Sequence, residues 1–158
     1  MRSRLAMGIV AAVACLCGLV IPSAAFAATP QVPSGASYQV ENDSHLNWLH
    51  LASDGYIQTN TSATLIYVTA GTNQEYRIDS SSGECLTYNS ANNEVHELAC
   101  ASKASQEWQS TKISGTGLWY VYNNYLGKGE CLQGDGNGSN VTMQTCDSGS
   151  DQKWNWTV

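Results

Sequence analysis

Four cysteines in the second half of the chain have a spacing that suits disulfide bonds. Cys85 and Cys100 are 15 residues apart, and so are Cys131 and Cys146. In an oxidising compartment, two thiols lose two electrons and two protons to form one disulfide. A zinc site would instead need a Cys-x-x-Cys pair or histidines at ligand spacing, and neither is present. Four cysteines allow three pairings, and counting alone does not choose among them.

An internal repeat favours one of these pairings. Gly83-Glu84-Cys85-Leu86 recurs 46 residues later as Gly129-Glu130-Cys131-Leu132, and the same shift relates Gln106-x-Trp108 to Gln152-x-Trp154. Under this shift Tyr76 also aligns with Tyr122. A repeat that closes its own loop predicts the pairs Cys85–Cys100 and Cys131–Cys146. Each would stabilise the fold by about 3 kcal/mol through loop-closure entropy.

The elements that position these residues are expected to be short β-strands. Residues 75–79, 109–113 and 118–123 mix β-branched and aromatic side chains. Clusters of Gly, Asn, Ser and Asp separate them, and turn signals arrive about every ten residues, which is typical of an all-β sandwich or barrel. No stretch after residue 35 shows a long apolar period of 3.6 residues.

A third, degenerate copy of the repeat is expected before residue 76. Tyr38-Gln39-Val40 aligns with Tyr76-Arg77-Ile78, and residues 65–69 would be the strand that ends this copy. The copy has no cysteine and no Gln-x-Trp. Residues 28–36, with two prolines and a glycine, are expected to form a loose leader, and 37–158 the folded domain.

The first 27 residues have the features of a secretory signal peptide. Arg2 and Arg4 precede an apolar run that ends at Ala25-Phe26-Ala27, a small-residue cleavage site. A transmembrane anchor is the alternative, but Pro22 ends the run and no basic cluster follows. We therefore expect a secreted, extracellular protein. Without this segment the chain keeps 131 residues, four cysteines and a net charge of −8.

Charge and motifs exclude several classes of function. The chain has 7 basic and 13 acidic residues, which argues against nucleic acid and anionic membrane surfaces as partners. His45, His50 and His96 are present, but no nucleophile elbow, HExxH motif or metal-ligand cluster accompanies them. We therefore expect no enzyme activity, no cofactor and no metal site, and we expect a monomer.

The pattern Gly-x-Cys-Leu, Val-x-x-x-x-Cys, Gln-x-Trp resembles the ricin-B-type lectin repeat. The resemblance is strong over residues 76–156 and weak over 36–70. It implies a β-trefoil of three pseudo-repeats, the first of them degenerate. Trp108 and Trp154 would be core anchors, and Gln106 and Gln152 would satisfy backbone groups nearby.

The resemblance also implies a shallow sugar pocket on each lobe, for a galactose-type or xylan-type ligand. Binding lobes of the family carry an Asp two residues after the first cysteine, an aromatic two residues before the second, and Asn or Asp before the Gln of Gln-x-Trp. The second repeat departs at all three positions, with Thr87, Leu98 and Ser105. The third keeps an acid at the last position, so the candidate sugar site lies there and comprises Asp135, Asn140, Gln144, Asp151 and Gln152.

Alternatives remain open for this loop and for the function. Residues 135–140 could be only a solvated turn; as the start of a calcium-binding EF-hand loop they lack Gly at position six and Glu at position twelve. Tyr88, Tyr120, Tyr125 and Trp119 are candidates for a displaced stacking face; alternation places Tyr120 and Tyr122 together and Trp119 opposite. The chain is expected to bind carbohydrate without catalysis. The alternative is a secreted trefoil that binds a protein, as an inhibitor or toxin-like partner, with degenerate sugar sites.

Overall fold

The computed structural model describes residues 32–70, 76–80 and 83–158, which are mostly β-structure. The predicted signal, residues 1–27, lies outside the described residues. Within the described part, no helix is long and apolar enough to cross a membrane. The elements are, in chain order, β1 Ala36–Asn42, β2 Asn47–Leu51, β3 Ile57–Asn60, β4 Ile66–Ala70, β5 Tyr76–Asp79, β6 Glu84–Asn89, β7 Glu94–Ala99, 3₁₀ helix η1 Ala104–Gln106, β8 Trp108–Lys112, β9 Trp119–Asn123, β10 Glu130–Gln133, β11 Ser139–Asn140, β12 Thr142–Thr145, 3₁₀ helix η2 Ser150–Gln152 and β13 Trp154–Thr157.

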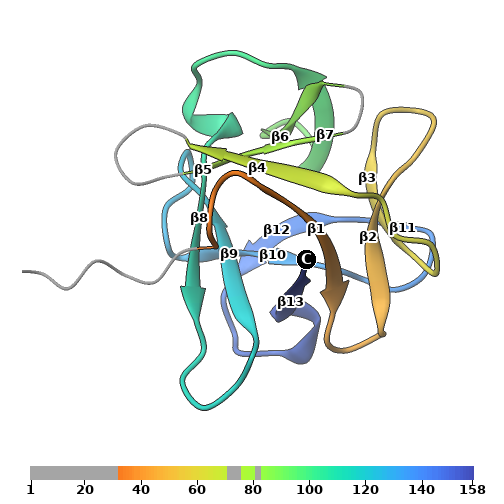
Figure 1. Ribbon diagram of the computed structural model, residues 1–158, viewed down its shortest axis with the longest axis vertical. Helices are drawn as coiled ribbons and strands as arrows, with labels where there is room; N and C mark the ends of the chain where they lie inside the picture. The colour runs from red at the N-terminus through yellow and green to blue at the C-terminus, as the bar shows by residue number, and fades with distance from the viewer. Residues whose placement is uncertain (1–31, 71–75, 81–82) are drawn as a thin grey trace, which may run out of the picture.

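Six strands close into an antiparallel barrel. The ring runs from β1 to β4, β5, β8, β9 and β13, and β13 pairs back with β1. Six further strands form three hairpins, β2–β3, β6–β7 and β10–β12, and the short β11 pairs with β3. The chain is thus three units: lobe 1 (β1–β4), lobe 2 (β5–β8) and lobe 3 (β9–β13), coloured orange to yellow, green, and cyan to blue in Figure 1.

Strand pairing defines which positions correspond between lobes. Tyr38 pairs with Ile66, Tyr76 with Trp108, and Trp119 with Trp154. Two residues further along the first strand of each lobe, the side chain is almost fully buried in the core: these are Val40, Ile78 and Val121. The expected alignment of Tyr38 with Tyr76 is confirmed, and so are the expected strands at 75–79, 109–113 and 118–123, to within one residue.

The connection from the first strand to the hairpin differs in length among the lobes. Asp79 pairs with Cys85, whereas the corresponding pair in lobe 3 is Tyr122 with Cys131. The connection in lobe 3 is therefore three residues longer. The predicted alignment of Tyr76 with Tyr122 was wrong for this reason, because the extra residues lie between the strand and the cysteine, and Trp119 holds the position of Tyr76.

The two Gln-x-Trp motifs are core elements, as predicted. Trp108 and Trp154 are fully buried, and each Nε1–H donates to a backbone oxygen, of Leu86 at 3.0 Å and of Leu132 at 2.9 Å. Gln106 is 2% exposed; its Oε1 accepts from the Ala101 N–H and its Nε2 donates to Ala99 O. Each glutamine therefore satisfies backbone groups in the turn that leads to the next barrel strand.

Lobe 1 builds the same junction from smaller residues. Ile66 takes the place of the tryptophan and is 2% exposed. Thr64, two residues before it, accepts a hydrogen bond at Oγ1 from the Leu51 N–H and donates its own N–H to Leu49 O. The first repeat is degenerate in sequence, yet it keeps its four strands and a polar side chain at the glutamine position.

Both predicted disulfides are present. Cys85 is bonded to Cys100 and Cys131 to Cys146. Each closes the base of one hairpin, β6–β7 or β10–β12. Trp48 stands at the corresponding position of lobe 1, paired with Asn60. Two disulfides are typical of extracellular proteins.

Val32 packs with the domain although it falls within the expected leader, residues 28–36. Its side chain is 3% exposed, and its N–H donates to Ser110 Oγ at 3.2 Å. The Tyr38 hydroxyl donates to the backbone oxygen of Pro33. The segment from Val32 is therefore fixed against the barrel, because Val32 contributes to the core.

Candidate functional site

A pocket of about 310 Å³ opens on lobe 2, beside the β6–β7 hairpin. Two tyrosines, a leucine, one amide and two hydroxyls line it: Tyr88, Asn89, Ser90, Leu98, Ser105 and Tyr125. No carboxylate or cationic side chain is among these lining residues. A pocket of this size with apolar walls and a few polar groups fits a small ligand.

The aromatic wall of the pocket consists of two tyrosine rings. Tyr88, on β6, is 8% exposed, and its hydroxyl donates to Asn93 Oδ1 at 3.0 Å. The ring of Tyr125 lies 5.9 Å from it, centroid to centroid, and is 60% exposed. Burial raises the pKa of Tyr88, and Tyr125 and Glu130 add to the shift. Tyr88 therefore stays a neutral phenol that supports the more exposed ring.

Tyr125 lies in the longer connection of lobe 3. Asn123, at the end of β9, donates from Nδ2 to the backbone oxygen of Ser105 at 2.9 Å, and its Oδ1 accepts from the Tyr125 N–H. Gly127, with φ of 77°, ends the turn by donating to Asn123 O. One fully buried amide thus joins the lobe 3 turn to the lobe 2 wall, so the pocket is shared between two lobes.

The lining also includes an exposed aliphatic side chain and fixed polar groups. Leu98, at the end of β7, is 51% exposed. Asn89 Oδ1 accepts from the Ala91 N–H at 3.1 Å, and Asn89 Nδ2 lies 3.4 Å from His96 Nε2. A lining that combines apolar side chains with amide and hydroxyl groups suits a ligand that has both C–H faces and hydroxyls.

The predicted sugar-site residues of lobe 3 partly occupy the corresponding surface. Asp135, Gln144 and Asp151 hold the positions of Asn89, Leu98 and Ser105, because the pairing of β10 with β12 matches that of β6 with β7. Gln133 links this surface to the buried motif. Its Nε2 donates to Asp135 Oδ1 at 2.6 Å, and its Oε1 accepts from Gln152.

The other two predicted residues lie elsewhere or inside. Gln152 is 1% exposed and bonds to the Asp147 N–H and Thr145 O, so it supports the turn from within. Asn140 lies on β11, which pairs with β3 of lobe 1, and its side chain bonds to Glu94 and Gln58. The structure therefore places three of the five on one surface and separates Asn140 from them.

Lobe 3 has no room for the aromatic wall seen in lobe 2. Gly134 holds the position of Tyr88, and a Cβ there would lie 2.7 Å from Thr59 Cγ2 and 3.1 Å from the Trp154 ring. Ser44, in the β1–β2 turn, takes the place of Tyr125, because Asn42 organises that turn as Asn123 does its own. Lobe 3 therefore presents carboxylates without rings, and lobe 2 presents rings without carboxylates.

Solved structures show the same architecture. The ricin B-like lectin of Macrolepiota procera, in complex with lactose, has a TM-score of 0.68 at 17% identity, with 80% of this chain and 98% of that chain covered. The designed three-fold symmetric protein ThreeFoil has a TM-score of 0.68 at 15% identity, covering 77% and 98%. A mosquitocidal holotoxin has a TM-score of 0.70 at 18% identity, covering 79% of this chain and 17% of its own.

The chain has the β-trefoil fold of ricin-B-type lectins. No protein-family model and no curated protein matches its sequence. The trefoil spans nearly the whole of the lectin and of the designed protein, but only a small part of the toxin. At sequence identities this low, structural similarity establishes the fold but not the function. What this trefoil binds must therefore be argued from its own side chains.

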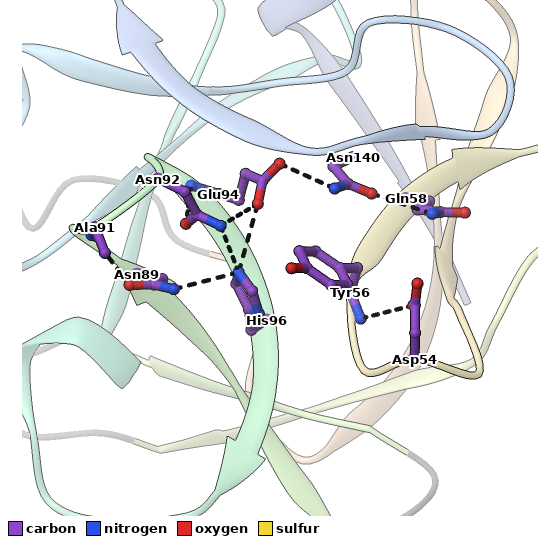
Figure 2. Close-up of polar contacts among 9 residues, drawn as sticks. All are labelled: Asp54, Tyr56, Gln58, Asn89, Ala91, Asn92, Glu94, His96 and Asn140. Atoms are coloured by element: carbon purple, nitrogen blue, oxygen red, sulfur yellow. Dashed lines mark hydrogen bonds and ion pairs between the residues drawn. The ribbon is translucent and has the colours of Figure 1, made fainter.

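A polar cluster joins the hairpins of the three lobes of the trefoil. Figure 2 shows Tyr56 facing His96, with ring centroids 4.2 Å apart, and Glu94 beside Asn140. The backbone pairs Tyr56–His96, Glu94–Thr142 and Asn140–Gln58 each join one lobe to the next. Because His96 Nε2 also contacts Asn89, a residue that lines the pocket, this polar cluster helps to position one side chain of the pocket.

The remaining aromatic candidates have structural positions in the trefoil. Trp119 packs against the core on the same face of β9 as Val121, and Tyr120 lies with Tyr122 on the opposite face. This settles which face of β9 is the inner one. The pocket residues Asn89, Ser90, Leu98 and Ser105 were missed as ligands because lobe 2 lacks the family's polar pattern. Of the pocket residues, only Tyr88 and Tyr125 were predicted from the sequence, as candidates for a stacking face.

Proposed function

We propose that the protein is a secreted, non-catalytic glycan-binding trefoil that binds an uncharged sugar in the pocket between Tyr88, Tyr125 and Leu98. The observation that carries this proposal is one pocket of about 310 Å³ whose lining combines two tyrosine rings and a leucine with amide and hydroxyl groups. Sugar rings stack their C–H faces on aromatic rings while their hydroxyls bond to amides and hydroxyls.

The charge of the pocket favours neutral sugars over acidic ones. No lining residue is cationic, and the chain carries a net charge of −6. A uronic or sialic acid would lose hydration on entering without gaining a partner of opposite charge. Neutral hexoses and pentoses, such as galactose-type or xylan-type units, meet no such cost.

The lobe 3 surface is a second candidate subsite. Asp135 and Asp151 are acceptors for sugar hydroxyls, and Gln144 beside them is exposed. Because no ring flanks them, binding there would depend on hydrogen bonds that water also offers, and should be weaker than in the pocket. The variant Asp151→Ala tests this subsite separately from the pocket.

A glycan array tests the proposed function, followed by calorimetry with the best neutral hit. We expect binding to neutral glycans that Tyr125→Ala removes and Asp151→Ala leaves largely intact. The matched control is Tyr67→Ala, because Tyr67 is a 43% exposed tyrosine on β4 that does not line the pocket. Binding to acidic glycans alone, or equal binding by wild type and Tyr125→Ala, would refute the proposal.

A protein partner is the second candidate function, and one observation favours it. Leu98 and Tyr125, exposed by 51% and 60%, both line the same pocket and form an apolar surface that a protein side chain could also cover. Pull-down with wild type and Tyr125→Ala separates the two functions. A partner lost with the variant, together with no response on the array, would favour the protein ligand.

A further inference from the structure

One disulfide, Cys85–Cys100, has a carboxylate in contact with both of its sulfurs. Asp79 Oδ1 lies 3.1 Å from Cys85 Sγ and 3.8 Å from Cys100 Sγ. Disulfide sulfurs carry no proton, so this contact acts through the negative charge of the carboxylate. Among the described residues, no carboxylate oxygen lies within 4.8 Å of both sulfurs of the second disulfide. The residue that corresponds to Asp79 there is Tyr122.

The two disulfides match in the burial of their first cysteine and in loop length. Cys85 and Cys131 are both fully buried, and both bonds span 15 residues. The second cysteine of each bond differs in exposure: Cys100 is exposed and Cys146 is half-buried. A reducing thiol must therefore attack the outer sulfur in each case. Exposure alone would make the first disulfide, Cys85–Cys100, the faster to open.

We propose that Asp79 protects Cys85–Cys100 from reduction by thiols, so that Cys131–Cys146 opens first. An incoming thiolate attacks Cys100 Sγ and forms a mixed disulfide, while the Cys85–Cys100 bond breaks and its electron pair passes to Cys85 Sγ. A second thiolate of the reductant then attacks its own sulfur in the mixed disulfide and releases Cys100 as a thiolate. The leaving thiolate at Cys85 forms beside the Asp79 carboxylate, which disfavours it, and a poorer leaving group slows the exchange.

This difference gives the two lobes different sensitivity to reduction. The protected bond closes the β6–β7 hairpin, which carries Tyr88 and Leu98. The unprotected bond closes the β10–β12 hairpin of lobe 3. Mild reduction would therefore loosen lobe 3 while the lobe 2 hairpin stays closed. This inference does not depend on what the pocket binds.

The test is the order in which the disulfides open. The folded, oxidised protein is incubated with dithiothreitol, alkylated at intervals and analysed by peptide mass spectrometry. In the wild type we expect Cys131–Cys146 to open roughly threefold faster or more. Asp79→Asn should speed the opening of Cys85–Cys100 by a similar factor and leave Cys131–Cys146 unchanged.

Two results would overturn the proposal. One is that Cys85–Cys100 opens first in the wild type, as its exposure predicts. The other is that Asp79→Asn leaves the ratio of the two rates unchanged. A variant that is merely less stable would open both bonds faster through unfolding, and the ratio cancels that effect. If Asp79→Asn does not fold, the order in the wild type alone supports or refutes the proposal.

Discussion

Asn123 of lobe 3 donates a hydrogen bond to the backbone oxygen of Ser105 in lobe 2, at 2.9 Å. Asn42 of lobe 1 does the same to Asp151 O in lobe 3. Both asparagine side chains are fully buried, and both also accept from the turn that follows them. The trefoil thus uses one residue type at two lobe junctions, and at the first junction it also positions a wall of the pocket.

Replacing Asn123 with alanine should cost about 2 kcal/mol of unfolding free energy, because it leaves the partly buried Ser105 carbonyl without this donor and frees the turn. Chemical denaturation measures this. Asn42→Ala is the matched control: we expect a similar loss of stability, but only Asn123→Ala should also weaken ligand binding at the pocket. Equal effects of both variants on binding would contradict the positioning role of Asn123.

Replacing Tyr125 with alanine should lower the affinity for a bound sugar about tenfold or more, because a stacking ring contributes about 1.5 kcal/mol. Stability should change little, since the ring is 60% exposed. Calorimetry gives the affinity and a thermal melt gives the stability. Tyr125→Phe keeps the ring and should keep most of the affinity; a loss as large as that of the alanine variant would mean that the hydroxyl is the main contact.

Replacing Leu46 with glycine should stabilise the protein by about 0.5 to 1 kcal/mol, because Leu46 holds a left-handed backbone with φ of 50° that a leucine adopts only with strain. Its side chain is 68% exposed, so little buried surface is lost. Gly127 occupies the corresponding position in lobe 3, with φ of 77°. Gly127→Ala should therefore lose about 1 kcal/mol, and a melt that shows the same sign for both would refute the argument.

Replacing Trp108 with phenylalanine should cost about 3 kcal/mol, because the smaller ring leaves a cavity and removes the donor to Leu86 O. Unfolding in denaturant reports the loss. Trp119→Phe is the control, because Trp119 is only partly buried and lies at the edge of the core. If both variants lose the same unfolding free energy, burial of the Gln-x-Trp tryptophan does not stabilise the fold more than a partly buried tryptophan does.

Three tyrosines should ionise later than a free tyrosine, since burial raises the pKa of Tyr38, Tyr88 and Tyr122 above 10.0. A raised pKa in the folded state stabilises the fold below pH 10. That contribution is lost as the pH rises through the folded value. Absorbance at 295 nm should show a late phase of tyrosinate formation above pH 10 together with falling stability. Tyr88→Phe should shrink the late phase by about a third, and an unchanged late phase would contradict the assignment.

The sequence was sufficient to predict the scaffold where large or reactive residues mark it. Two cysteine pairs and two Gln-x-Trp motifs define lobes 2 and 3, because these residues have narrow roles in the core. The corresponding junction in lobe 1 was harder to predict, because Thr64 and Ile66 stand where lobes 2 and 3 have glutamine and tryptophan. Threonine and isoleucine are common residues and form no recognisable motif. Strand pairing is needed to recognise them.

The pocket was less predictable than the scaffold, because it depends on a three-residue difference in one turn. An alignment by identical residues keeps Tyr76 on Tyr122 and hides the longer connection that carries Tyr125. The predicted polar residues of lobe 3 were chosen from the family pattern, with Asp135 standing two residues beyond the family's Asp position. Three of the five, Asp135, Gln144 and Asp151, do correspond to residues of the lobe 2 pocket, but Gly134 leaves no space for a ring there.

The pairing of β1 with β13 has a consequence for how the molecule assembles. Gln39 lies opposite Thr157, so β1 pairs with one of its two barrel neighbours only after β13 has been synthesised. A nascent chain therefore carries an open sheet edge for most of its synthesis, while the local hairpins and their disulfides can already form. Closure of the ring is then a late, long-range event, whereas the three hairpins depend only on local pairing.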